Sequence, residues 1–241
     1  MSDEQQTSAR HGGNEVRIPA PDGDFDGYLA LPGGGHGPGV VVIQEWWGLV
    51  DAVRDDCDRL ARAGFVALAP DLYRGEATLD PDVASRLMMD LEIPRAERDL
   101  EAAVTELLRH ESVDGARVGC IGFCMGGQLA LDAATRDPRI AAVVDCYGIH
   151  PNVKPDLRGL QAAVLGIFAE NDEFIPQQAV RALEADLAAA GKRAHIEIVP
   201  GVQHAFLNDR RPEVYDPAAA ARTWDRIATF LRAELSNAGS A

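Results

Sequence analysis

The sequence predicts an α/β fold with a mostly parallel central sheet and helices on both of its faces. Short, continuous apolar runs recur along the chain, as is typical of strands that are buried on both faces. Segments with the apolar spacing of helices separate these runs, which is the pattern of repeated βα units. The runs are Val40–Ile43, Phe65–Ala69, Ile140–Cys146 and Ala162–Ala169.

Length and composition agree with a globular chain. The 241 residues are 46% hydrophobic and 25% charged, close to the average of globular domains. We expect residues 1–14 to form a disordered tail and residues 15–241 to form a single α/β domain, because no linker or repeat interrupts the pattern. The polar tail lacks the apolar stretch of a secretory signal, and no run approaches the roughly 20 residues of a membrane span. These features predict a cytoplasmic protein without a membrane segment.

The charge balance narrows the choice of partners. With 23 basic and 38 acidic residues the formal net charge is −15, which argues against nucleic acid and against anionic membrane surfaces. We expect no metal site, because no Cys/His pairs have the spacing of metal ligands. The sequence leaves open whether the protein is a monomer or a small homo-oligomer.

The first part of the chain is predicted as two strands, a loop and a βαβ unit. The strands cover Val16–Ala20 and Tyr28–Leu31, and Pro32–Gly39 is a loop because it contains five glycines and two prolines. After the first buried run comes a helix that Gly64 ends. Its apolar stripe consists of Val53, Cys57, Leu60 and Ala61.

The rest of the chain alternates between helices and strands. Further strands are predicted over Val118–Gly122 and Ile196–Val199. Helices are predicted over Asp82–Leu91, from near Pro94, over Met125–Thr135, over Pro176–Ala190, and at the end of the chain, where Trp224, Ile227, Leu231 and Leu235 form an apolar stripe. In such sheets the functional residues gather in loops at the carboxyl ends of the strands.

One such loop contains a candidate nucleophile. Residues 122–126 read Gly-Phe-Cys-Met-Gly, directly after a predicted strand and at the start of a helix. This is the setting of a nucleophile elbow, with Cys124 in the place of serine. Glycines allow the strand and the helix to approach closely, and a helix N-terminus favours the thiolate form of a cysteine. The other cysteines, Cys57, Cys120 and Cys146, are expected to be buried structural thiols.

A candidate acid and a candidate base follow in the chain order expected for such a site. Asp172 follows one buried strand and His204 follows the last strand. Glu170 and Glu173 are alternatives for the acid. Asp172 is preferred because Pro176, four residues later, places it just before the next helix. Together these residues predict a Cys-His-Asp triad in which His204 moves protons and Asp172 orients the imidazole.

At this point the sequence resembles the dienelactone hydrolases, or carboxymethylenebutenolidases, a family with the α/β-hydrolase fold. The resemblance extends over nearly the whole chain after residue 15. It rests on residues 44–48 (Gln-Glu-Trp-Trp-Gly), 70–73 (Pro-Asp-Leu-Tyr), 122–127, 147–148 (Tyr-Gly), 171–172 (Asn-Asp) and 201–206. The cysteine elbow combined with Gln-Glu after the third strand is quite specific.

The resemblance implies a cofactor-free cysteine hydrolase that cleaves a small enol-lactone or activated ester through a thioester acyl-enzyme. In the family, the glutamate at the Glu45 position contacts the resting thiol and moves away when substrate binds. A carboxylate beside a thiol would also keep the thiol protonated. The backbone N–H groups of Met125 and Trp46 would form the oxyanion hole.

The resemblance also implies a substrate-binding set. It consists of Trp47, Tyr73, Arg74, Tyr147, Phe206 and Asn208. In the family two arginines hold a substrate carboxylate. Arg74 is shifted by one residue from the first of these positions, and Asn208 stands at the second, with arginine only at Arg210 and Arg211. Which of the three arginines would bind a carboxylate remains open, and with it the natural substrate.

Two other functions are compatible with the same residues. One is a general small-molecule carboxylesterase. The other is a non-catalytic or thiol-redox-sensing protein that uses Cys124. A sensor would need a resolving cysteine, and Cys120, four residues earlier, lies on a strand that is predicted to be buried.

Overall fold

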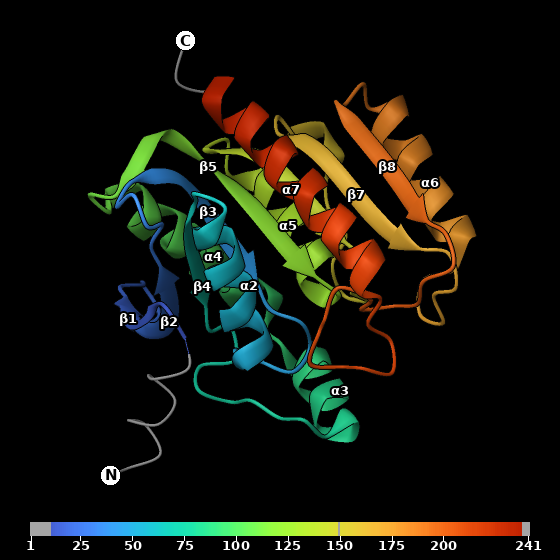
Figure 1. Cartoon of the computed structure of the whole chain (residues 1–241), viewed down its shortest axis with the longest axis horizontal. Helices are drawn as coiled ribbons and strands as arrows, with labels where there is room; N and C mark the ends of the chain where they lie inside the picture. The colour runs from blue at the N-terminus through green and yellow to red at the C-terminus, as the bar shows by residue number, and fades with distance from the viewer. Residues whose placement is uncertain (1–10, 149, 238–241) are drawn as a thin grey trace.

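An eight-stranded sheet runs through the computed structural model, which describes residues 11–148 and 150–237 (Figure 1). The strand order is β1-β2-β4-β3-β5-β6-β7-β8. Only β1, β2 and their junction with β4 are antiparallel, and the other pairings are parallel. The strands are β1 (Asn14–Ile18), β2 (Phe25–Ala30), β3 (Gly37–Ile43), β4 (Val66–Pro70), β5 (Val113–Phe123), β6 (Ile140–Cys146), β7 (Ala163–Ala169) and β8 (Ala194–Val199).

Helices cover both faces of this sheet, as the sequence predicts. The helices α2 and α7 pack on one face, whereas α4, α5 and α6 pack on the other. Figure 1 shows α3 apart from both groups, beyond one end of the strands. The helices are α2 (Asp51–Arg62), α3 (Pro81–Asp90), α4 (Ile93–Arg109), α5 (Met125–Arg136), α6 (Gln177–Ala189) and α7 (Pro217–Asn237), with a short 3₁₀ turn η1 (Leu157–Gly159).

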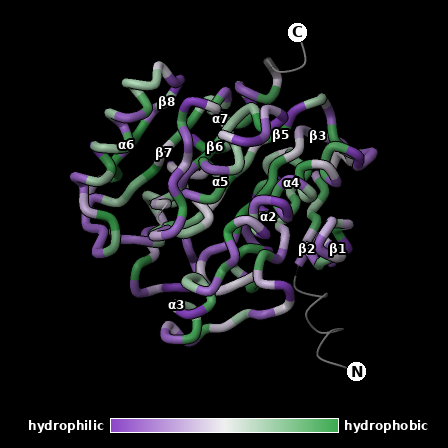
Figure 2. Tube along the Cα trace, turned by 180° about the vertical axis from the view of Figure 1, so that it is seen from behind, coloured by the Kyte–Doolittle hydropathy of each residue, from purple (hydrophilic) through white to green (hydrophobic). Residues whose placement is uncertain are grey.

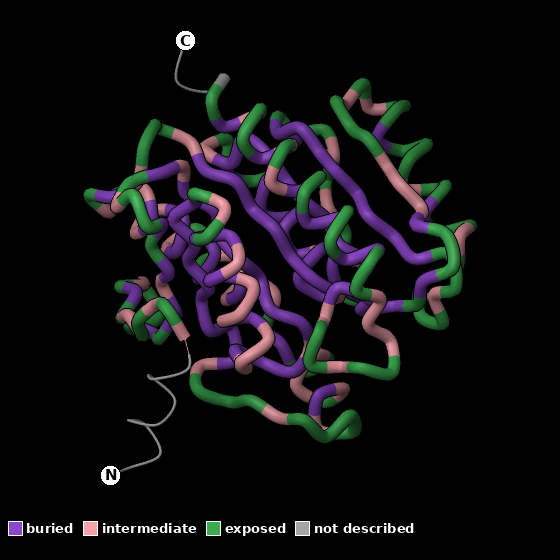
Figure 3. Tube along the Cα trace, viewed as in Figure 1, coloured by how far each residue is buried: buried purple, intermediate pink, exposed green. Residues whose placement is uncertain are grey.

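The core consists of two apolar layers, one on each side of the sheet. Val40 and Val42 of β3 pack in the layer under α2 and α7, and Val41 and Ile43 pack in the layer under α4 and α5. Because successive residues of a strand point to opposite faces, a strand between two layers of helices is apolar throughout. Figure 2 shows the hydrophobic centre of the sheet, and Figure 3 shows the same strands buried, with exposed residues on the outer sides of the helices.

Several strands begin earlier than the sequence predicts, because of pairing that the pattern does not reveal. The strand β2 begins at Phe25, β3 at Gly37 within the predicted loop, and β8 at Ala194. The strand β5 begins at Val113, five residues earlier than expected, because Val113 pairs with Gly37 of β3. The strand β1 begins at Asn14, within the predicted tail.

Residues 11–13 also make contacts with the rest of the structure and do not belong to a tail. His11 is almost fully buried against Asp51, and Gly12 donates a hydrogen bond to Asp58. The expectation of a tail over residues 1–14 is therefore wrong for residues 11–14, because contacts with α2 hold this segment. Residues 1–10 lie outside the described residues. In the part of the chain that the structure describes, no helix has both the length and the apolar character needed to cross a membrane.

Candidate functional site

The turn between β5 and α5 places Cys124 in a conformation that few non-glycine residues adopt. Its φ is 53° and its ψ is −125°, and such strained positions gather at functional sites. The flanking glycines permit this turn. A Cβ at Gly122 would collide with the carbonyl of Gly126, and a Cβ at Gly126 would lie 2.5 Å from the carbonyl oxygens of Ile43 and Gln44. Glycine at these two positions therefore lets β5, α5 and β3 meet at the thiol.

The loops after β7 and β8 bring Asp172 and His204 together. The Nδ1 atom of His204 lies 2.7 Å from Oδ2 of Asp172. The other carboxylate oxygen, Oδ1, accepts hydrogen bonds from the amides of Phe174 and Ile175 at 2.8 and 3.0 Å. The carboxylate is therefore held by three donors, and its orientation toward His204 is determined by its own loop.

The two alternative acids lie elsewhere. The Oε2 atom of Glu170 accepts a hydrogen bond from the amide of Gly201, and Glu173 is exposed. Neither carboxylate forms an ion pair with His204 in the described structure, whereas that of Asp172 does. The choice of Asp172 from the sequence thus agrees with the geometry.

The surroundings of His204 favour its protonated form. Burial lowers the pKa of the imidazole, but the hydrogen bonds with Asp172 and Cys124 and the charges of both groups outweigh it and raise the pKa to about 10. Two aromatic rings hold the imidazole. The ring of Tyr147 lies 4.9 Å from it between centroids, and that of Phe174 lies 5.0 Å away in an edge-on arrangement.

Cys124 and His204 open into a cavity of about 260 Å³. Its walls come from the loop after β3, from α3, and from the loops that contain Asp172 and His204. The lining residues are Glu45, Trp46, Trp47, Pro81, Met88, Cys124, Phe174, His204, Ala205 and Arg211. A cavity of this size, close to the lower end of small-molecule sites, suits a compact ligand.

Glu45 is the acidic group of this cavity. Its side chain is buried, and its Oε2 atom accepts a hydrogen bond of 2.8 Å from Nδ2 of Asn208. Burial raises the pKa of the Glu45 carboxyl, while the charge of His204, the Asn208 amide and the charge of Arg211 lower it. Asn208 therefore holds the Glu45 carboxyl by a hydrogen bond and does not itself line the cavity.

The two residues expected to supply oxyanion donors, Met125 and Trp46, lie at the elbow and in the cavity wall. Met125 is the first residue of α5, where a backbone N–H has no acceptor within the helix. Trp46 lines the cavity and packs edge-on against Trp47, with ring centroids 5.0 Å apart. The hydroxyl of Tyr73 donates to Sδ of Met125 at 3.2 Å, so Tyr73 supports this turn from behind.

Of the predicted substrate-binding set, Trp47 lines the cavity, whereas Tyr73, Arg74, Tyr147, Phe206 and Asn208 are not among its lining residues. Tyr147 and Phe206 are fully buried and pack against each other behind His204. The guanidinium of Arg74 forms two hydrogen bonds with Asp99 and one with the carbonyl of Gly23, and it stacks on Phe25. The structure thus gives Arg74 a structural partner, because the turn after β4 directs its side chain toward α4.

Some residues of the cavity were not recognised in the sequence. Phe174 is 55% exposed and covers His204, and Pro81 and Met88 come from α3. An aromatic residue two positions after the acid was a usable signal for Phe174. For Pro81 and Met88 the sequence offered no signal, because only the path of the chain brings α3 over the thiol. Arg211, one of the three arginines that were left open, does line the cavity.

The other cysteines are buried, as predicted for structural thiols. Cys57, Cys120 and Cys146 are at most 1% exposed. Among residues 11–148 and 150–237, no group of three or more His, Cys, Asp or Glu side chains has the arrangement needed for a metal ion.

Several known proteins are similar to this chain in sequence. The model of the Dienelactone hydrolase family matches residues 25–235. Protein usf of Aquifex pyrophilus is 36% identical over 217 residues, which cover 87% of this chain and 94% of that protein. The Aquifex aeolicus protein named "Putative carboxymethylenebutenolidase" is 33% identical over 216 residues, covering 87% and 93% of the two chains.

Solved structures agree with the sequence relatives. The dienelactone hydrolase-like promiscuous phosphotriesterase P91 from metagenomic libraries superimposes with a TM-score of 0.82 at 25% identity, covering 92% of this chain and 99% of that one. An acylaminoacyl peptidase of Pyrococcus horikoshii, 16% identical with a TM-score of 0.72, covers 98% of this chain and 44% of its own, and shows the shared α/β-hydrolase fold. The family match and these relatives show that the chain belongs to the dienelactone hydrolase family and is a hydrolase that acts on ester bonds.

Proposed function

We propose that the protein cleaves a small enol-lactone or activated ester through a Cys124–His204–Asp172 triad and a thioester intermediate, without a cofactor. One observation carries this proposal. Cys124, on its strained elbow, faces the same small cavity as His204, whose Nδ1 lies 2.7 Å from the Asp172 carboxylate. A nucleophile, a proton carrier and a group that orients the carrier are thereby in the order that acyl transfer requires.

The first half-reaction forms the thioester. Cys124 passes its proton to Nε2 of His204 and its sulfur adds to the substrate carbonyl, whose oxygen gains negative charge beside the amides of Met125 and Trp46. The bond to the leaving oxygen then breaks, and His204 donates a proton to that oxygen. Because the pKa of His204 is raised to about 10, the imidazolium is available as an acid at neutral pH.

The second half-reaction releases the acid. A water molecule loses a proton to His204 while its oxygen adds to the thioester carbonyl, and the C–S bond then breaks. Asp172 keeps Nδ1 of His204 protonated in both halves, so that Nε2 remains the atom that exchanges protons with the reactants.

Glu45 sets the reactivity of the resting thiol in this proposal. The charged groups that share the cavity with Cys124 are Glu45, His204 and Arg211. The Glu45 carboxylate repels the negative charge of an attacking sulfur, whereas the His204 imidazolium attracts it. Replacing Glu45 by glutamine should therefore raise the rate at which iodoacetamide alkylates Cys124 near neutral pH severalfold. An unchanged alkylation rate would show that Glu45 has no influence on the thiol.

The choice of a thiol as nucleophile favours substrates with good leaving groups. An ordinary cysteine thiol has a pKa of about 8.5, far below that of an alcohol, so a tetrahedral adduct of an alkyl ester expels the thiolate again. Enol and aryl esters release a stabilised anion instead. A series of esters with one acyl group should therefore show kcat/KM rising steeply as the pKa of the leaving group falls. A flat series with rate-limiting acylation would favour a general carboxylesterase.

An anionic group on the substrate would meet Arg211. The Nε atom of Arg211 donates to Glu213 at 2.8 Å, and the residue lines the cavity beside Cys124. Its neighbour Arg210 provides a matched control, because it is bound to Asp55 and is not among the residues that line this cavity. Arg211→Ala should raise KM for a carboxylated lactone and leave a neutral aryl ester nearly unaffected, whereas Arg210→Ala should change neither.

The decisive experiment is to trap the acyl-enzyme. Rapid quenching of the reaction with 4-nitrophenyl acetate, followed by peptide mass spectrometry, should show an acetyl group on the peptide that contains Cys124. The Cys124→Ala variant should lose this adduct and roughly 10⁴-fold or more in kcat. Cys57→Ala, which removes a buried thiol away from the cavity, should keep both. Near-wild-type turnover by folded Cys124→Ala would overturn the proposal.

A further inference from the structure

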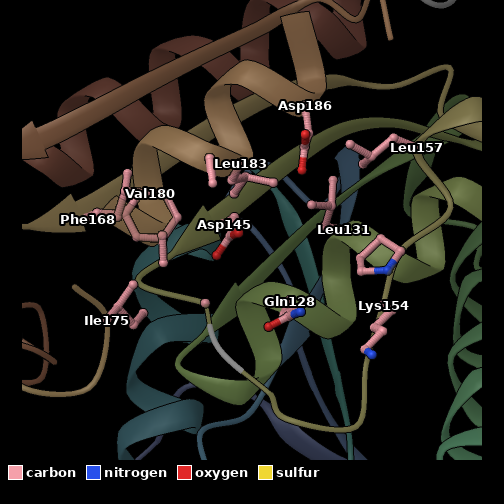
Figure 4. Close-up of a pocket in the computed structure, with 14 residues that line it drawn as sticks. Gln128, Leu131, Asp145, Lys154, Leu157, Phe168, Ile175, Val180, Leu183 and Asp186 are labelled. Carbon is pink, nitrogen blue, oxygen red and sulfur yellow. The ribbon is translucent and has the colours of Figure 1, made fainter. Parts of the chain in front are cut away.

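A second cavity lies on the α5 and α6 side of the sheet (Figure 4). Its volume is about 350 Å³, and it is bounded by α5, α6, β7 and the segment that follows β6. It shares no lining residue with the cavity of Cys124. The ester hydrolysis proposed above gives this space no role.

The cavity has an acidic group on a mostly apolar floor. Asp145, on β6, is 2% exposed, and its Oδ1 atom has no hydrogen-bond partner of good geometry within the described structure. Figure 4 shows this carboxyl among Phe168, Leu183 and Gln128. Burial raises the pKa of Asp145 to about 7, an effect that the amide of Gly148 opposes. Ionising a buried carboxyl is costly, and a ligand that brings a positive charge to it would offset that cost.

Glycines create the space around this carboxyl. A Cβ at Gly127 or at Gly148 would collide with Oδ1 of Asp145. Two backbone segments thereby enclose Oδ1 of Asp145, and the residue lines the cavity with the rest of its side chain. The amide of Gln128 is already engaged, because it donates to the carbonyl of Val153 and accepts from the amide of His150. Asp145 is therefore the buried polar group with capacity for a ligand.

The remaining walls and the rim suit a short apolar chain. Buried side chains of Leu131, Phe168 and Val180 form apolar walls. The two charged residues that line the cavity beside Asp145 are Lys154 and Asp186, and both are exposed at its rim, where water screens them.

We propose that this cavity binds a small organic ammonium ion, with its NH₃⁺ group on the Asp145 carboxylate and its hydrocarbon part against the walls. A charge-assisted hydrogen bond to a desolvated carboxylate is among the strongest available to such a ligand. The net charge of −15 attracts cations to the molecule. A metal ion fits less well, because the described residues contain no cluster of ligands for one and the walls are apolar.

The pH dependence of binding follows from the state of Asp145. The ammonium ion needs the ionised carboxylate, and primary amines stay protonated up to about pH 10. With the pKa of Asp145 at about 7, affinity should be low at pH 5.5 and should rise as the pH passes through 7.

Calorimetric titration of the whole protein with n-butylammonium chloride at pH 8, in constant sodium chloride, tests the proposal. Uncharged butanol is the control ligand, and it should not bind. Asp145→Asn should weaken ammonium binding about 10- to 100-fold, the range expected for one charge-assisted hydrogen bond. Asp186→Asn, which changes a carboxylate only at the rim, should weaken it less than threefold.

A second variant leaves Asp145 intact. Ala182 lines the cavity from an exposed position on α6, so Ala182→Trp should fill the space and abolish binding in a folded protein. Binding should also persist after alkylation of Cys124, because the two cavities are separate. The proposal is overturned if wild type does not bind butylammonium, or if Asp145→Asn or Ala182→Trp binds it as tightly as wild type. None of these measurements depends on ester hydrolysis.

Discussion

Replacing Asp172 by asparagine tests the core of the proposed mechanism with the smallest possible change in shape. In the native loop, Oδ1 accepts hydrogen bonds from two backbone amides, and Oδ2 faces Nδ1 of His204 at 2.7 Å. An asparagine must keep its oxygen on the amides, so its NH₂ group replaces Oδ2. This group can only donate, and Nδ1 of His204 must then become an acceptor.

The consequence is the wrong tautomer of His204. With Nδ1 unprotonated, the hydrogen of a neutral imidazole lies on Nε2, which can no longer accept the proton of Cys124. The corresponding substitution in a Ser-His-Asp hydrolase lowers kcat about 10⁴-fold, which is about 5.5 kcal/mol of activation free energy. The pKa of His204 should also fall from about 10, because the hydrogen bond and charge of Asp172 are among the causes that raise it.

The assay is kcat for an aryl ester, together with its pH profile, for Asp172→Asn and for Glu173→Gln. The second variant removes one carboxylate charge from the adjacent, exposed position and should stay within threefold of wild type. Thermal unfolding verifies that both proteins fold. If Asp172→Asn keeps more than a tenth of wild-type kcat, the assignment of Asp172 as the orienting group is refuted.

Three further predictions concern residues outside the reaction itself. Arg74→Ala should cost about 3–5 kcal/mol in urea unfolding, because it leaves the fully buried Asp99 unpaired; a variant that is as stable as wild type but has a raised KM would restore Arg74 to the substrate site. In the folded protein the pKa of Asp145 is raised from 3.8 to about 7, so its contribution to the free energy of unfolding is full below pH 3.8 and is lost as the pH rises through 7. Urea unfolding at pH 4 and at pH 8 should therefore show wild type losing roughly 4 kcal/mol of stability relative to Asp145→Asn. Gly126→Ala should lower the free energy of unfolding by about 1–3 kcal/mol and should also lower kcat, because its Cβ would lie 2.5 Å from two carbonyl oxygens. Gly33→Ala is the control, because the space around Gly33 is open, and it should change neither quantity.

Much of the site could be predicted because its chemistry is encoded in local segments. The elbow around Cys124 depends on glycines within two or three positions, and the acid and the base each follow a strand directly. A strand of a parallel sheet ends at a known edge, so residues just after neighbouring strands must lie close together. For this reason the sequence placed Cys124, Asp172 and His204 at one edge, where the structure brings them together.

The direction of long side chains could not be predicted in the same way. Arg74 was expected to face the substrate, but the turn after β4 directs it to Asp99. Asn208 was expected to contact substrate, but it bonds to Glu45 across 163 positions of sequence. Each outcome depends on which distant partner lies within reach of a flexible side chain, and that is a property of packing.

The sequence by itself determined the succession of strands and helices along the chain, the two-layer core and the edge of the sheet where the nucleophile lies. These follow from the period of apolar residues and from glycines, both of which act over a few neighbouring positions. The tertiary structure alone decided which residues line the cavity of Cys124, among them Met88 from α3 and Arg211 from the loop before α7. It alone also decided that Asp145 faces a second cavity. Cavities are formed by segments far apart in the chain, and the free energy that places them comes from burial summed over the whole core, which no local pattern contains.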